Sequence, residues 1–148
     1  MTGDDLTDEG AARFQQTLVQ HAPDAIIYAD AEGVVRYWNT GAERLFGFSA
    51  REAVGQSLDL IIPENLRARH WEGYRAVARS GQSRYGAGEI LAVPALRKDG
   101  THLSVEFTIV PIRDEDGRMC GLGAIIRDVT ERFEELKRLR AEVKAKKG

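Results

Sequence analysis

His70 is the residue of this 148-residue chain with the clearest capacity for ligand chemistry. It shares one face of a predicted helix with Leu66, Tyr74 and Val77, because these residues follow one another at spacings of four, four and three. We expect that face to point into the domain, where a neutral imidazole is a good ligand for iron. The alternative interpretation is a core histidine that is hydrogen-bonded to a neighbour.

Two aromatic residues, Trp71 and Tyr74, follow His70 in the same predicted helix. They have the flat faces needed to pack on a planar ligand. Aromatic residues at helical spacing also fill a protein core without any ligand, and the sequence leaves both interpretations open.

Catalytic and metal-binding patterns are missing from the sequence. No Ser-His-Asp order, phosphate-binding loop or glycine-rich dinucleotide turn occurs, and no pair of histidines shares helical spacing with an acid. Cys120 is the only cysteine, which excludes an internal disulfide and a cysteine-rich zinc site and predicts a buried, inert thiol. We therefore expect a sensor or binding protein rather than an enzyme.

Composition favours a cytoplasmic protein without nucleic-acid or membrane partners. A formal net charge of −2 gives no global attraction to nucleic acid or anionic lipid. The apolar runs are much too short to cross a membrane, and the acidic start lacks the basic-then-apolar order of a signal peptide. The single cysteine is consistent with a reducing compartment.

Hydrophobic periodicity predicts both helices and strands. After an acidic start of ten residues that we expect to be mobile, the segments are a helix to 21, strands 25–29 and 34–39, helices 40–48 and 49–55, a longer helix from Pro63 to Ser80 that ends at Gly81, strands from Tyr85 to Leu96, 102–109 and 120–126, and a charged helical tail from Val129. Ser49 and Glu52 form a capping box for the helix over 49–55, and Gly33, Gly100 and Gly117 end the predicted turns between strands. Hairpin turns make the sheet antiparallel with its helices on one face, which is an α+β fold.

Such a sheet can enclose a pocket beneath the longer helix. Three apolar periodicities converge on that interior. The expected lining residues are Leu66, His70, Trp71, Tyr74, Leu103, Val105, Phe107, Leu122, Ala124 and Ile126.

Five motifs resemble those of PAS sensor domains and occur in the family's order. They are HAPDAI (21–26), WNTGAERLFGF (38–48), EAVG (52–55), RKDG (97–100) and RDVTER (127–132). The resemblance spans roughly residues 14 to 135. It implies a five-stranded antiparallel sheet in the order 2-1-5-4-3, and a role in sensing and dimerisation rather than catalysis.

The run IPENLRARH (62–70) is similar to the stretch before the proximal histidine of haem-binding oxygen-sensor PAS kinases. This narrower resemblance implies haem b with His70 as the iron ligand. Trp71 looks like an inserted residue before Tyr74, and the place of the distal arginine holds Glu89 or has no equivalent. The missing distal arginine bears on oxygen binding more than on haem binding.

Other ligands stay open at this point. Photosensory relatives carry a reactive cysteine on or near the long helix, and no cysteine lies between Glu64 and Ser80, so a covalent flavin or coumarate photocycle is not expected. The alternatives to haem are a flavin, a small apolar metabolite, or a cofactor-free module for protein–protein interaction and dimerisation.

The resemblance implies a bacterial signal-sensing module of three parts. These are an acidic tail and flanking helix over 1–21, the PAS domain over 22–128 and a signalling helix over 129–148. Asp128 and Thr130 stand at the last junction, where they can cap the final helix and, by analogy, pass sheet movements onward. No kinase, cyclase or DNA-binding domain follows, so we expect either part of a larger sensor or a stand-alone protein with an unidentified partner.

Apolar stripes on both flanking helices predict a homodimer. The front stripe is Ala11, Phe14 and Leu18, and the back one is Phe133, Leu136 and Val143 in a heptad-like spacing that Arg140 interrupts. The alternative is a monomer in which the front stripe folds back onto its own sheet.

Overall fold

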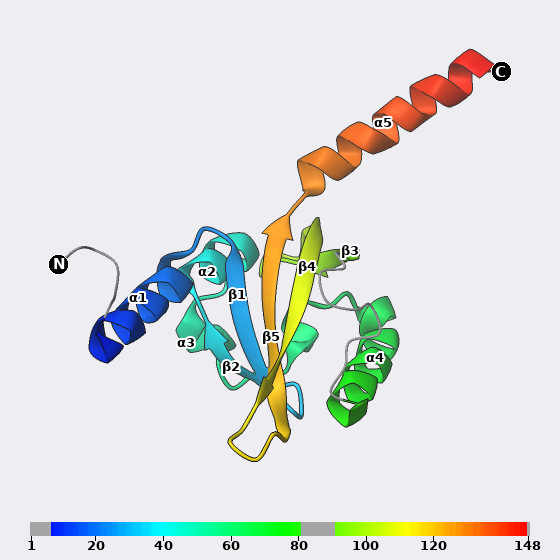
Figure 1. Ribbon diagram of the computed structural model, residues 1–148. Helices are drawn as coiled ribbons and strands as arrows, with labels where there is room; N and C mark the ends of the chain where they lie inside the picture. Colours follow the sequence, from blue (N-terminus) through cyan, green and yellow to red (C-terminus); the bar gives the residue numbers. More distant parts are fainter. Residues whose placement is uncertain (1–6, 81–90, 148) are drawn as a thin grey trace.

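The computed structural model describes residues 7–80 and 91–147, and the predictions for Gly81, Tyr85 and Glu89 lie outside these residues. Its centre is a five-stranded antiparallel sheet in the order β2-β1-β5-β4-β3 (Figure 1). This order and the α+β class confirm the predicted fold. The strands are β1 Ala25–Asp30, β2 Val35–Trp38, β3 Leu91–Leu96, β4 His102–Arg113 and β5 Met119–Asp128.

Helices and short 3₁₀ turns precede, connect and follow these strands along the chain. They are α1 Asp8–His21, α2 Thr40–Phe46, α3 Ala50–Ala53, the 3₁₀ turns η1 Leu58–Ile61 and η2 Glu64–Leu66, α4 Arg67–Ser80 and α5 Thr130–Lys147.

The central strand β5 defines the two faces of the sheet. Ile126 of β5 pairs with Ala25 of β1 and with Phe107 of β4, so these three residues share the inner face. Ile126 is buried, whereas Ile125, its neighbour in sequence, is exposed on the outer face. The alternation predicted for this strand is therefore confirmed.

The β1–β2 hairpin turns through Asp30 and Gly33. The backbone N–H of Gly33 donates to the Asp30 carbonyl at 2.9 Å, and Oδ1 of Asp30 accepts from the backbone N–H of Val34 at 3.0 Å. Gly33 has a φ of +82°, a conformation that residues with a side chain rarely adopt.

The short helices follow their predicted signals. Oγ of Ser49 accepts from the Glu52 N–H at 3.1 Å, and the Ser49 N–H donates to Oε1 of Glu52 at 2.9 Å, which completes the predicted capping box. The preceding helix ends at Phe46 rather than Phe48, because Gly47 takes a left-handed conformation with φ of +82°.

The longer helix begins at Arg67, and the prediction that it opens at Pro63 was wrong. Pro63 has ψ of 140°, and Ile62 before it is also extended, as expected for a residue that precedes proline. The N–H of Leu66 then donates to the Pro63 carbonyl at 2.9 Å in a 3₁₀ turn that leads into α4.

Helix α1 begins three residues before the predicted start at Ala11. Oγ1 of Thr7 accepts from the N–H of Gly10 at 3.0 Å, and Asp8 and Glu9 occupy the first turn, where carboxylates are favourable. The prediction that all of the first ten residues are mobile was therefore wrong for Asp8, Glu9 and Gly10.

The core has two parts. The larger cluster joins the sheet to α2, α3 and η1, and its largest fully buried apolar side chains are Phe46 and Leu103. The smaller cluster joins α4 to the sheet through Tyr74, Val77 and Leu122. These two clusters fix the positions of α2 and α4 on the same inner face.

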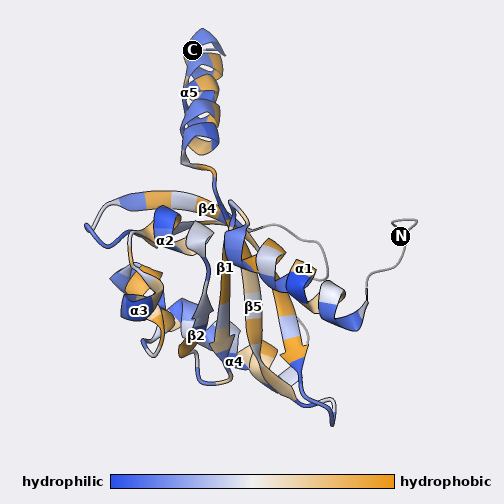
Figure 2. Cartoon of the chain, turned by 90° about the vertical axis from the view of Figure 1, so that its left-hand side faces the viewer, coloured by the Kyte–Doolittle hydropathy of each residue, from blue (hydrophilic) through white to orange (hydrophobic). Residues whose placement is uncertain are grey.

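Helix α5 leaves the end of β5 and runs away from the sheet (Figure 1). It contains no buried residue, and in Figure 2 it is mostly hydrophilic with hydrophobic residues at intervals. Within residues 7–80 and 91–147, every helix is too short or too polar to pass through a lipid bilayer.

Candidate functional site

His70 lies in the first turn of α4, and its side chain is half-buried. Its Nδ1 atom is buried and has no hydrogen-bond partner among the described residues. Burial lowers the pKa of His70, against the opposing effect of the Asp59 carboxylate, so the imidazole is held neutral near pH 7. A neutral imidazole with an unpartnered inner nitrogen has a donor or acceptor position available for a ligand.

Two aromatic rings of α4 contact the imidazole of His70. The ring centroid of Trp71 is 4.7 Å away with an interplanar angle of 72°, and that of Tyr74 is 5.9 Å away with an angle of 43°. The rings of Trp71 and Tyr74 are themselves 5.4 Å apart. These favourable tilted contacts make His70 part of an aromatic cluster.

Trp71 packs on the β1–β2 turn. Its Nε1 donates to Oδ1 of Asp59 at 2.7 Å. Its ring atoms Cη2 and Cζ3 lie so close to Gly33 that a Cβ added there would be 2.1 Å from each. The contacts of Trp71 with Asp59 and Gly33 hold the indole within the protein. Its contact with a planar ligand stays a prediction.

Tyr74 anchors α4 to β1. Its buried hydroxyl donates to the carbonyls of Ala29, at 3.3 Å, and of Asp30. Burial raises the pKa of Tyr74, and the Asp30 carboxylate adds to this, so the hydroxyl stays protonated and keeps its donor role.

The strand residues of the predicted pocket divide between the two core clusters. The larger cluster holds Leu103, Val105 and Ile126, with Phe107 and Ala124 partly buried against it, and the smaller one holds Leu122. Leu66 is half-buried in η2. These residues share an interior, but their role in lining a ligand site stays a prediction.

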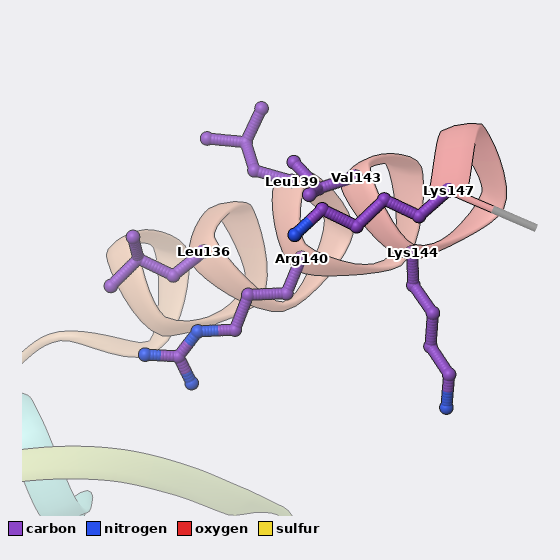
Figure 3. Close-up of a pocket in the computed structure, with 6 residues that line it drawn as sticks. All are labelled: Leu136, Leu139, Arg140, Val143, Lys144 and Lys147. Atoms are coloured by element: carbon purple, nitrogen blue, oxygen red, sulfur yellow. The ribbon is translucent and has the colours of Figure 1, made fainter.

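Two open hollows are lined by residues other than His70. One, of about 580 Å³, is lined by Pro63, Glu64, Asn65, Leu96 and His102. The other, of about 390 Å³, runs along α5 and is lined by Leu136, Leu139, Arg140, Val143, Lys144 and Lys147 (Figure 3).

Asp128 and Thr130 join the sheet to α5 as predicted. Oδ1 of Asp128 accepts from the backbone N–H of Thr130 at 2.9 Å, so this side chain satisfies the first N–H group of α5. Oγ1 of Thr130 accepts from the N–H of Ser104 in β4 at 2.9 Å, and Asp128 pairs with Arg97 at 3.4 Å. The start of α5 is thus tied to both β4 and the β3–β4 turn.

Cys120 is a free thiol, but it is half-buried rather than buried as predicted. Its Sγ donates to the carbonyl of Ile112 at 3.3 Å, and its own carbonyl accepts from the Tyr28 hydroxyl at 3.2 Å. The β4–β5 register shifts next to Ile112, near the turn that closes the hairpin and close to the partly accessible thiol.

Two features next to the aromatic cluster could not be predicted from the sequence, namely the role of Asp59 and the contact made by Gly33. Asp59 was not singled out, because a single acid before a helix has many surface roles. Gly33 was recognised as a turn glycine, which is consistent with its positive φ, but its contact with Trp71 depends on how α4 packs against the hairpin.

The strand order, the helices on the inner face and the flanking helices define the class of PAS sensor domains. Residues 19–134 match the family described as the PAS fold, and the chain belongs to this family.

Similar proteins include two bacterial sensors and one solved domain. Sensor protein FixL of Bradyrhizobium diazoefficiens is 33% identical over 88% of this chain, and Oxygen sensor protein DosP of Escherichia coli is 29% identical over 84% of it. The chain spans only 26% and 16% of the lengths of these two relatives. The crystal structure of a PAS domain from Colwellia psychrerythraea is 25% identical with a TM-score of 0.72, over 82% of this chain and 98% of that domain.

Proposed function

We propose that this PAS domain is a bacterial sensory module that binds haem b through His70 and relays the state of the haem through its flanking helices. The observation that carries the proposal is the buried Nδ1 of His70, which has no hydrogen-bond partner in the described part of the chain. Buried polar atoms are nearly always satisfied, so an unsatisfied one at an inward-facing histidine is typical of a ligand position.

The electrostatic surroundings of His70 suit an iron ligand. An imidazole binds a metal only in its neutral form, and burial lowers the pKa of His70 in the direction that favours this form. Tyr74 is protonated and uses its hydroxyl on β1 carbonyls, so it does not compete for the imidazole. The chain's own residues thus supply one neutral donor within an apolar, aromatic setting. A bound haem would supply an iron atom that can take a gas ligand or change its oxidation state.

The comparisons support a gas or redox signal. One similar protein carries the name of an oxygen sensor, and another is a sensor protein, although both are much longer than this chain. At about 30% identity this likeness supports the class of signal and not the particular gas.

The haem proposal is tested by titrating the purified chain with hemin and recording the visible absorption spectrum. We expect a Soret band that shifts and saturates at one equivalent of hemin. A spectrum without a saturable one-to-one complex would overturn the proposal. Flavin absorption in the protein as purified would instead favour the flavin alternative.

We further propose that the module pairs with a second copy through α1 and α5. Phe14 and Leu18 of α1 are 56% and 57% exposed, and α1 has no buried residue. On α5, Leu136, Leu139 and Val143 are also exposed and lie on the same side of the helix (Figure 3). Burying these apolar stripes against a second copy would remove them from water.

The predicted stripe of Phe133, Leu136 and Val143 is exposed along α5, and Leu139 is a fourth exposed apolar residue beside it. The spacing of three and four that joins Leu136, Leu139 and Val143 follows the helical repeat. Arg140 lies beside this stripe, pointing to another side of the helix, and does not interrupt it (Figure 3). A spacing of three and then four residues is the heptad repeat of helices that pack against one another, which supports pairing of α5 with a second copy.

A further inference from the structure

Trp71, the neighbour of His70 in α4, is held by two contacts outside its own helix. Its Nε1 donates to Oδ1 of Asp59 in η1 at 2.7 Å, and this oxygen also lies 4.0 Å from Nε of Arg67. The opposite edge of the indole ring lies against Gly33 and occupies the space that a side chain at position 33 would fill. An indole with its polar atom bonded and its edge in close contact has little freedom to change rotamer.

The imidazole of His70 rests against this fixed indole. The two rings meet edge to face with centroids 4.7 Å apart. Histidines that bind a metal are usually oriented by a hydrogen bond to their second ring nitrogen. Nδ1 of His70 is the nitrogen left open for the ligand, and the described residues supply no hydrogen bond to the imidazole that would orient it. Contact with the neighbouring rings therefore orients the imidazole.

We propose that Trp71 is a positioning residue, which holds the imidazole of His70 in its inward orientation and is itself supported by Asp59 and Gly33. The inference rests on the proposed function only in taking His70 as the residue that holds the ligand. The orientation of the ring belongs to the ligand-free chain and is measurable without haem.

The same arrangement controls the charge near His70. Burial lowers the pKa of His70 and favours the neutral form, whereas the charge of the Asp59 carboxylate raises this pKa and favours the protonated form. The indole N–H of Trp71 bonds one oxygen of this carboxylate, and Arg67 lies near the same oxygen. Tyr74, the other titratable group in contact with the ring, is protonated. Loss of the indole would therefore expose the imidazole and free the carboxylate at once.

The first test is a ¹⁵N NMR titration of the histidines in the ligand-free chain. In Trp71→Phe the pKa of His70 should rise toward its ordinary value of 6.5, because the N–H bond to the Asp59 carboxylate is lost and the smaller ring covers less of the imidazole. In Asp59→Asn it should fall below the wild-type value, because the side chain keeps an oxygen for the indole and loses its charge. Any other pattern in these two variants overturns the proposal.

Trp38 provides the matched control, since it is the other tryptophan of the chain. It is buried in the larger core cluster, where its Nε1 donates to the Phe48 carbonyl at 2.9 Å. Trp38→Phe therefore also removes an indole hydrogen bond, but away from His70. It should leave the pKa of His70 unchanged, and a shift equal to that of Trp71→Phe would show that any loss of core packing has the same effect and would overturn the proposal.

Gly33 offers an independent test from the opposite side of the indole. Gly33→Ala would push the indole away, whereas Gly100→Ala has the same backbone strain, with φ of +84° against +82°, and its Cβ would meet open space. We expect the pKa of His70 to rise in Gly33→Ala alone. Equal behaviour of the two variants would contradict the support role of Gly33.

Hemin affinity gives the final readout. Loss of a residue that orients a metal ligand typically weakens metal binding about 10- to 100-fold, and we expect this loss in Trp71→Phe but not in Trp38→Phe. Unchanged affinity in Trp71→Phe would overturn the proposal. If the wild-type chain binds no hemin, the proposed function fails, while the NMR titrations still decide the role of Trp71.

Discussion

Nδ2 of Asn39 donates to the backbone carbonyl of Val19 at 2.8 Å and ties the end of α1 to the start of α2. The same nitrogen donates to the Asp24 carbonyl at 3.1 Å, while Oδ1 accepts from the backbone N–H groups of Ile26 and Ala42 at 2.8 and 2.9 Å. Asn39 is fully buried, and these four bonds use the whole capacity of its amide.

Asn39→Ala should therefore destabilise the domain strongly. Each backbone group left buried without a partner costs about 1–3 kcal/mol, so we expect a loss of at least about 2 kcal/mol in the free energy of unfolding, measured by urea denaturation. Asn65→Ala is the matched control, because Asn65 is exposed in η2 and its replacement should change the free energy by no more than about 0.5 kcal/mol. Similar small effects of both substitutions would contradict the role given to Asn39.

Stability should depend on pH through His70. Burial lowers the pKa of His70 in the folded chain below its ordinary value of 6.5. Above about pH 7 both states are neutral at this ring; as the pH falls below 6.5 the unfolded chain takes up a proton that the folded chain resists. The free energy of unfolding should thus decrease with acidification, by at most about 1.4 kcal/mol per pH unit, down to the folded pKa.

Urea denaturation of wild type and His70→Gln between pH 5 and 7.5 measures this effect. The variant should lack the part of the slope that His70 contributes. The lowered pKa values of Glu52, Asp30 and Asp99 affect stability in the same direction, but only below about pH 5, and they act equally in both proteins. Identical slopes for the two proteins would show that His70 is not buried as a neutral ring.

The junction with α5 should depend on the hydroxyl of Thr130. Thr130→Val removes the acceptor for the Ser104 N–H and should cost about 1 kcal/mol, with faster hydrogen exchange of that amide. Thr108→Val, a like substitution at a half-buried position within β4, should change neither quantity appreciably. Slow exchange of the Ser104 amide in Thr130→Val would refute this role.

Self-association is tested by sedimentation velocity at micromolar concentration. We expect a dimer that is weakened by Phe14→Glu and by Leu136→Glu, since each places a charge in an apolar stripe. Gln15→Glu adds the same charge to α1 at an exposed position beside the stripe and should leave the dimer intact. A single species of monomer mass, unaffected by any of these substitutions, would rule out the homodimer.

Most of the fold could be predicted because it depends on local signals. Alternating strand residues, turn glycines and the capping box of Ser49 and Glu52 act over a few residues, and each was confirmed. The start of α4 was missed because Pro63 suits both the first turn of a helix and an extended segment before one. The packing of Ile61 of η1 into the core cluster is a tertiary contact that such a local signal does not describe.

The candidate site was less predictable, because its contacts join distant segments. The helical spacing was enough to place His70 and Tyr74 on the inward face of α4. It did not indicate that the Tyr74 hydroxyl reaches the carbonyls of β1, or that Trp71 contacts Gly33 across the hairpin. Such contacts depend on how whole elements pack, and periodicity describes only one element at a time.

The central claim is that His70 holds haem. The most direct test is a hemin titration of three variants, each of which replaces one histidine by alanine. The chain has three histidines, and both His21 and His102 are exposed. We expect His70→Ala to abolish the saturable Soret band while its far-ultraviolet circular dichroism stays that of the wild type, and His21→Ala and His102→Ala to keep wild-type spectra and affinity. A His70→Ala protein that binds hemin with the wild-type spectrum and affinity would contradict the account.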